Sequence, residues 1–64
     1  MPRLTRREEE VLRSIAEGKT TSKMAEELFV STHTIETHRR NLMQKFNVSN
    51  SASLIKMASE YKLI

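Results

Sequence analysis

The sequence predicts a small all-α domain of four helices, because helix-capping residues recur along it and the apolar residues after each cap return at helical spacing. Its 64 residues are enough for a single domain, which we expect to span residues 1–64. A chain of this length buries only a thin core, and it contains no cysteine that could add a disulfide or a thiolate metal site. Stability must therefore come from helix packing or from a bound partner.

The first helix is predicted over residues 6–17. Thr5 and Glu8 have the spacing of a capping box, in which the threonine hydroxyl accepts from the amide of the glutamate and the glutamate side chain accepts from the amide of the threonine. Gly18 is suited to the left-handed residue that ends many helices. The apolar stripe of this helix is Val11, Leu12 and Ile15.

Two more helices are predicted over residues 21–28 and 32–46, with a short turn between them. Threonines and a serine offer N-caps for the first of these, and Ser31 caps the second. Phe29 and Val30 in the turn are apolar, so we expect their side chains to point inward. The apolar stripe of the longer helix falls within about 40° on a helical wheel, and we expect it to face the core. That stripe is Ile35, Leu42 and Phe46, and the expected core adds Val11, Leu12, Ile15, Leu28 and Ile55.

A fourth helix is predicted over residues 51–62, capped by Ser49 or Asn50. Its inward-facing residues should be Leu54, Ile55 and Ala58. One edge has little reason to be apolar in a monomer, so we expect a small contact between two copies there. Such a contact falls short of the roughly 1,200 Å² of a stable interface, so the homodimer should be weak. The residues of this edge are Ser53, Met57 and Tyr61. An isolated exposed methionine is also ordinary in a monomer, which leaves both alternatives open.

The positive charge of the chain lies in its second half. Residues 1–30 hold six basic and six acidic side chains, whereas residues 31–64 hold five basic and two acidic ones, which accounts for the net charge of +3. An excess gathered in one region favours an anionic partner. An ordinary solvated surface is the alternative.

Catalysis and metal binding find no support in the sequence. His33 and His38 are five residues apart and point about 140° apart on one helix, whereas a helical metal pair needs a spacing of four. The hydroxyl residues cluster at predicted caps, and there is no glycine-rich phosphate loop. We therefore expect no enzyme activity, no cofactor and no small-molecule ligand in this domain. No apolar run approaches the roughly 18 residues of a membrane span, and we expect a soluble, cytoplasmic protein.

The face of helix 32–46 opposite its apolar stripe carries side chains that can bind base edges. Arginine pairs with guanine, glutamine with adenine, and a threonine methyl packs on the thymine methyl. These residues are His33, Thr37, Arg40 and Gln44, flanked by Glu36 and Asn41. A short helix, a tight turn and a longer amphipathic helix form a helix-turn-helix, whose second helix enters the major groove of double-stranded DNA. A generic polar face is the alternative, although it would be expected to carry more lysine–glutamate pairs.

Five runs of residues add a family resemblance. They are 4–12, 16–18, Met24–Ala25 with Leu28, 30–38, and Asn41–Leu42 with Lys45, Phe46 and Val48. Together they strongly resemble the LuxR-type helix-turn-helix domain, which forms the C-terminal DNA-binding half of NarL/FixJ response regulators of two-component systems and of quorum-sensing regulators. The resemblance covers nearly the whole chain, and it fixes the first capping box and the recognition helix at the family's spacing.

This resemblance implies that the third helix reads the major groove and that the fourth contributes to dimerisation. The positions that match the family's base-reading residues are Glu36, Thr37 and Arg40. Matching positions that we assign to the DNA backbone are Asn41, Lys45 and Thr34, for which a cap contact is the alternative. The start of helix 21–28 is also suited to a phosphate, because a helix N-terminus attracts anions. Its candidates for backbone contact are Lys19, Thr20, Thr21 and Lys23.

The chain departs from the family pattern at three positions, Glu36, Ser51 and Lys23, the last of which leaves helix 21–28 without the acidic half of a capping box. Glu36 stands where many members carry lysine or arginine. Phosphates repel a carboxylate unless it accepts from a cytosine amino group or pairs with Arg40. Ser51 occupies a position that is often arginine, so whatever that arginine does is missing here.

We therefore expect the DNA-binding output domain of a bacterial transcription regulator, either as a fragment of a larger protein or as a stand-alone member. Its homodimer should form mainly on DNA. One alternative is a sigma-factor-type, promoter-binding helix-turn-helix, for which RNA polymerase would be a partner. Another is a helical protein-interaction module that uses the edge of Leu54, Met57 and Tyr61.

Overall fold

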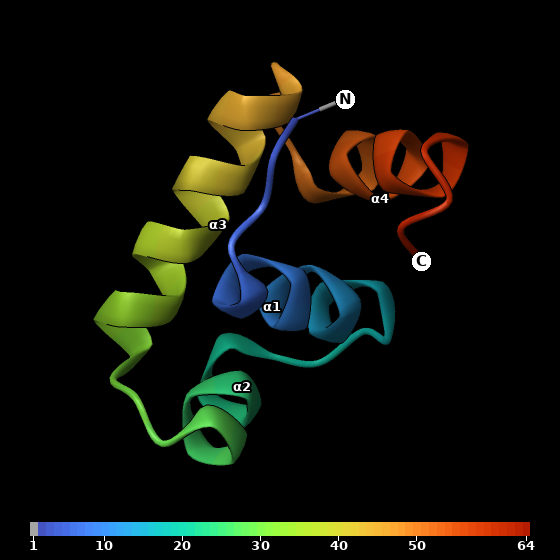
Figure 1. Cartoon of the computed structure of the whole chain (residues 1–64). Coiled ribbons are helices and arrows are strands. Elements are labelled where there is room, and N and C mark those ends of the chain that lie inside the picture. Colours follow the sequence, from blue (N-terminus) through green and yellow to red (C-terminus); the bar gives the residue numbers. More distant parts are fainter. Residues whose placement is uncertain (1) are drawn as a thin grey trace.

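The computed structural model describes residues 2–64 and contains, in that range, four helices and no strand (Figure 1). The helices are α1 (Arg6–Ala16), α2 (Thr21–Leu28), α3 (Thr32–Phe46) and α4 (Ser51–Glu60). The predicted all-α class is confirmed. The bounds of α2 and α3 are those expected from the sequence, whereas α1 ends one residue earlier and α4 two residues earlier than predicted.

Each helix begins at a side chain that caps it. In α1 the capping box is complete, because the Thr5 hydroxyl accepts from the Glu8 amide at 3.1 Å and the Thr5 amide donates to the Glu8 carboxylate at 2.9 Å. The caps of the later helices are Thr20, Ser31 and Asn50, whose side chains accept from the amides of Lys23, Thr34 and Ser53. A cap of this kind contributes about 1 kcal/mol, and its position explains why the helix starts are readable from the sequence.

A residue with positive φ follows each helix and stops it. Gly18 has this role after α1 and Lys62 after α4, each one residue beyond the C-cap. After Gly18, the Lys19 amide donates to the Ser14 carbonyl at 3.1 Å, and after Lys62, the Leu63 amide donates to the Ala58 carbonyl at 2.9 Å. At the end of α4 the left-handed residue is Lys62 and not a glycine, and this stop makes the helix shorter than predicted. Asn47 and Phe29 are the corresponding residues of α3 and α2, with φ of 55° and 58°.

The expectation that both apolar residues of the turn point inward is wrong for one of them. Phe29 is 94% exposed, since the left-handed C-cap position directs its side chain to solvent. Val30 is partly buried and packs on the core as expected. A non-glycine residue in the left-handed region costs about 1–2 kcal/mol, so Phe29 stores strain between α2 and α3.

The core lies where α1, α2 and α4 meet the inner face of α3. Figure 1 shows α3 along one side of the molecule and α1 in the centre, with the segment before α1 passing beside α3 from near the C-terminal end of α3 to the start of α1. The buried apolar residues are Val11, Leu12, Ile15, Met24, Ala25, Ile35, Leu42, Phe46, Leu54 and Ala58. Six of the eight predicted core residues are in this set, but Leu28 and Ile55 are only partly buried and pack against its surface. Leu54 and Ala58, which were predicted to face inward from the fourth helix, are completely buried, and Met24, one turn before Leu28, is buried as well.

None of the helices in the described range is both long enough and apolar enough to cross a membrane.

Candidate nucleic-acid interface

The packing of α3 fixes which of its side chains are available to a ligand. Ile35 and Leu42 are completely buried and Phe46 is 4% exposed, so the predicted inner stripe is confirmed. The opposite face is polar. Its residues are His33, Arg40 and Gln44, which are exposed, and Thr37, which is half-buried, flanked by exposed Glu36 and Asn41. A helix of 15 residues is about 22 Å long, and the major groove of DNA, about 12 Å wide, admits such a helix.

Arg40 is an exposed cation of this face. Among residues 2–64, no carboxylate lies within ion-pairing distance of its guanidinium and no acceptor hydrogen-bonds to it. It borders a shallow depression of about 320 Å³ on the outer side of α3, together with Met43, Gln44 and Val48. An unpaired guanidinium keeps all five of its N–H donors for a partner such as guanine, which accepts in a bidentate manner.

The hydroxyl hydrogen of Thr37 is used in a hydrogen bond within the helix. The hydroxyl donates to the backbone carbonyl of His33 at 3.1 Å. What it offers a partner is its methyl group and an acceptor lone pair, and a methyl group suits the thymine methyl.

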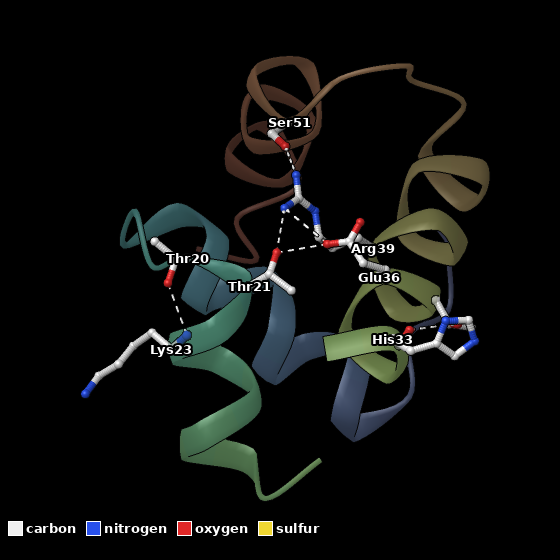
Figure 2. A network of polar contacts seen from close by, with 8 residues as sticks. Thr20, Thr21, Lys23, His33, Glu36, Arg39 and Ser51 are labelled. Atoms are coloured by element: carbon white, nitrogen blue, oxygen red, sulfur yellow. Dashed lines mark hydrogen bonds and ion pairs between the residues drawn. The ribbon is translucent and has the colours of Figure 1, made fainter. Parts of the chain in front are cut away.

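Glu36 is engaged by Thr21 of α2 and by Arg39 of its own helix. The hydroxyl of Thr21 donates to its carboxylate at 2.9 Å, and the guanidinium of Arg39 lies 4.0 Å from the same oxygen (Figure 2). The carboxylate is thus paired at a spacing of three residues with Arg39, whereas the pairing considered from the sequence was with Arg40 at a spacing of four.

Arg39 joins three helices and was not among the candidates from the sequence. One of its terminal nitrogens donates to the Ser51 hydroxyl at 2.7 Å, and the other donates to the Thr21 hydroxyl at 3.4 Å (Figure 2). Its side chain is only 28% exposed. The sequence signal that could have pointed to Arg39 was Ser51, because this departure from the family pattern places a small acceptor at the start of α4.

The N-terminus of α2 presents backbone amides and Lys23, for which no ion pair or side-chain hydrogen bond is found within residues 2–64. Thr20 caps the helix by accepting from the Lys23 amide at 3.1 Å, so its hydroxyl hydrogen remains available. The first turn of α2 holds no acidic residue, which leaves the positive end of the helix dipole uncompensated. The Lys23 side chain extends away from the helix into solvent (Figure 2). This end of α2 is therefore electropositive, as expected for a phosphate contact.

Lys19, another predicted backbone contact, is held by carboxylates. Its ammonium lies 2.8 Å from Glu27 and 3.5 Å from Glu17. The hydrogen bond with Glu27 raises the pKa of Lys19 and lowers the pKa of Glu27. A phosphate would have to compete with both carboxylates, and the role assigned to Lys19 stays a prediction.

Lys45 faces α1. Its ammonium ion-pairs with Glu8 and donates to the backbone carbonyl of Arg3 at 3.0 Å. Glu8 is 4% exposed. Burial alone would raise its pKa, but Lys45 and the amide and hydroxyl of Thr5 outweigh burial, and the pKa of Glu8 lies below its ordinary value. The phosphate contact assigned to Lys45 stays a prediction, and the structure gives this side chain a second role in fastening α3 to α1.

The other residues predicted to contact DNA or a second copy differ in their exposure. Thr34 is half-buried, with its hydroxyl 3.0 Å from that of Ser31. On the α4 edge, Ser53 and Met57 are half-buried, and Tyr61 is 39% exposed with its ring centroid 6.0 Å from that of Phe46. The accessible part of that edge is therefore largely the tyrosine.

Comparison with known proteins is consistent across sequence and structure. Relatives include the uncharacterized response regulatory protein YgeK of Escherichia coli, 49% identical over 55 residues that cover 86% of this chain and 37% of YgeK. The oxygen regulatory protein NreC of Staphylococcus carnosus is 41% identical over 61 residues, which cover 95% of this chain and 28% of NreC. The chain thus spans little more than a third, or less, of the length of these relatives.

A solved structure and a family model complete the comparison. The response regulator ChrA of a heme-sensing two-component system superposes with a TM-score of 0.89 at 32% identity, over all of this chain and 33% of ChrA. Residues 2–58 match the model of the bacterial regulatory proteins of the luxR family, GerE. That match covers most of the chain, all of α1, α2 and α3, and most of α4. The chain therefore belongs to the luxR family of bacterial regulatory proteins.

Proposed function

We propose that this chain is the sequence-specific DNA-binding output domain of a bacterial transcription regulator, with α3 in the major groove. The observation that carries the proposal is the two-sided character of α3. Its inner stripe is completely buried at Ile35 and Leu42, while its outer face presents the unpaired guanidinium of Arg40. A helix held so firmly by its inner face presents the outer one as a rigid reader.

Base reading is assigned to three side chains. Arg40 donates to the O6 and N7 acceptors of a guanine, and Thr37 packs its methyl group on a thymine methyl. Glu36 accepts from the amino group of a cytosine, which is the base-edge donor suited to a carboxylate. These roles suit the exposure and the remaining hydrogen-bonding capacity of each side chain.

Positioning on the DNA backbone is assigned first to the start of α2. Lys23, the hydroxyl of Thr20 and the backbone amides of Thr20 and Thr21 meet one phosphate as α2 crosses the strand, whereas the Thr21 hydroxyl hydrogen is already given to Glu36. Thr34 and Asn41 contact phosphates that border the groove. Lys19 and Lys45 contribute only if they exchange a carboxylate for a phosphate, because both are ion-paired in the free chain.

The relatives and the architecture favour a response-regulator output domain over the two alternative functions. YgeK and ChrA are described as response regulators, which supports this role over that of a sigma-factor-type domain bound to RNA polymerase. A protein-interaction module using the α4 edge is less well supported, because Met57 is half-buried and Leu54 is completely buried. We assign to Tyr61 a weak contact between two copies on DNA.

The test is selection of binding sites from random duplex DNA, followed by affinity measurements on the selected site. Arg40→Ala should cost about 1–3 kcal/mol there and relax the preference at one base pair. Lys56→Ala is the matched control, because it also removes one exposed positive charge but lies on α4. It should have a small effect, equal on all sequences. If Arg40→Ala costs no more than Lys56→Ala, the proposed reading face is wrong.

A further inference from the structure

Arg39 and its partners form a continuous polar chain from α4 to the reading edge of α3. Figure 2 shows the guanidinium between Ser51, at the start of α4, and Thr21, at the start of α2, with the Glu36 carboxylate beside it. The distances are 2.7 Å to the Ser51 hydroxyl, 3.4 Å to the Thr21 hydroxyl and 4.0 Å to the carboxylate. The first residues of two other helices therefore meet on one side chain of the recognition helix.

The direction of hydrogen bonding along this chain is fixed by chemistry. An ionised carboxylate can only accept and a guanidinium can only donate. The Thr21 hydroxyl must then give its single hydrogen to Glu36, at 2.9 Å, and accept from Arg39 with a lone pair. The carboxylate is thus held twice, directly by the charge of Arg39 and through the oriented hydroxyl of Thr21.

This arrangement bears on an electrostatic difficulty of the reading face. Glu36 is the only acidic side chain in α3, and its side chain is 53% exposed. Phosphates repel a free carboxylate, and a freely rotating one also loses side-chain entropy when it docks. A neighbouring guanidinium reduces the repulsion, and two fixed contacts reduce the entropy lost. No ion pair joins Glu36 to Arg40 within residues 2–64, so the Arg40 guanidinium stays available to a ligand.

We propose that Arg39 is a positioning residue for base recognition, which, with Thr21, holds the Glu36 carboxylate ready to accept from a cytosine amino group and so sets a preference for a C·G pair. The inference rests on the proposed function. Arg39 itself touches no base. Its side chain is 28% exposed and already donates to acceptors on α2 and α4, which distinguishes it from Arg40.

The experiment measures the ratio of affinities for the selected site and for the same site with the pair read by Glu36 replaced. In the wild-type chain we expect this ratio to be about tenfold or more. Arg39→Gln should reduce it by roughly three- to tenfold, whereas the ratio at the pair read by Arg40 should be unchanged. In the Glu36→Gln background, Arg39→Gln should change neither ratio further. Arg13→Gln is the matched control, because it neutralises an exposed arginine of α1 and should leave both ratios unchanged.

A second variant keeps the test decisive if Arg39→Gln melts below the assay temperature. Thr21→Val keeps the shape of the side chain but removes the hydroxyl that holds Glu36, and it should lower the same ratio. Equal loss of affinity on all sequences, with a salt slope flattened by about one unit, would make Arg39 a phosphate contact. Unchanged ratios in folded variants would make it purely structural. Either result overturns the inference and leaves the proposed function intact. A Glu36→Gln chain with unaltered preference overturns the inference together with the base contact assigned to Glu36. Sequence-specific binding through α3 fails if the wild-type chain selects no sequence or if Arg40→Ala costs no more than Lys56→Ala.

Discussion

The ion pair between Lys45 and Glu8 gives the sharpest prediction about stability. Lys45→Met keeps most of the aliphatic stem of the side chain and removes its charge, so Glu8 loses its cation while remaining 4% exposed. Leaving a buried hydrogen-bonding group without its partner costs about 1–3 kcal/mol, and a fully buried charge costs more. We place the expected loss in that range, below the roughly 3–5 kcal/mol of a fully buried pair, because the lysine side chain is 35% exposed.

The effect should depend on pH in a defined direction. The pKa of Glu8 in the folded chain lies below its ordinary value, so ionisation of this group contributes stability that is present above the unfolded pKa and is lost as the pH falls through the folded pKa. The difference in unfolding free energy between wild type and Lys45→Met should therefore be largest near neutral pH. It should start to shrink as the pH falls below the ordinary pKa of a glutamate, about 4.3, and disappear once the carboxyl is protonated in the folded chain as well.

Thermal unfolding followed by circular dichroism measures both effects. In a domain of this size the expected loss lowers Tm by about 10 °C or more. Lys56→Met, at an exposed position of α4, is the control and should leave Tm nearly unchanged. If Lys45→Met unfolds like this control and instead weakens binding to all DNA sequences, with a salt slope flattened by about one unit, Lys45 is a phosphate contact and the reasoning is refuted.

Three further perturbations test the core, the turn and the assembly. Leu42→Ala should cost about 2–5 kcal/mol, which is enough to unfold so small a domain, and an unchanged Tm would contradict the orientation of α3. Phe29→Gly should raise Tm by a few degrees in the same thermal scan, because it relieves a left-handed backbone and removes a side chain that is 94% exposed; a lower Tm would show that the turn is unstrained. Two half-sites about one helical turn apart should be bound cooperatively, and moving them by about five base pairs should abolish cooperativity while single-site affinity is kept. Equal cooperativity at both spacings, in titrations of DNA, would remove the case for a contact through α4.

Local chemistry explains why the helices could be predicted so closely. A cap residue and a left-handed stop act on their own neighbours, so Thr5, Ser31 and Gly18 mark boundaries without reference to the rest of the fold. The stripe of α3 is likewise a property of one helix. Phe29 shows the limit of this reasoning, because an apolar residue is not obliged to be buried, and its backbone position decides where the side chain points.

The features that the sequence did not reveal depend on how helices are placed against one another. Lys45 and Glu8 are 37 residues apart, and no periodicity links them. The same holds for Arg39, whose partners lie 18 residues before it and 12 residues after it. Helix periodicity orients one helix at a time, so it could separate the inner and outer faces of α3 but could not show which outer side chains a neighbouring helix engages.

The central claim, that the outer face of α3 lies against base edges, is tested most directly by NMR of the chain bound to its selected duplex. We expect intermolecular nuclear Overhauser effects from the Thr37 methyl group to major-groove protons, the thymine methyl or cytosine H5. Contacts confined to minor-groove sugar protons, or contacts of α4 with the duplex while Thr37 shows none, would contradict the account.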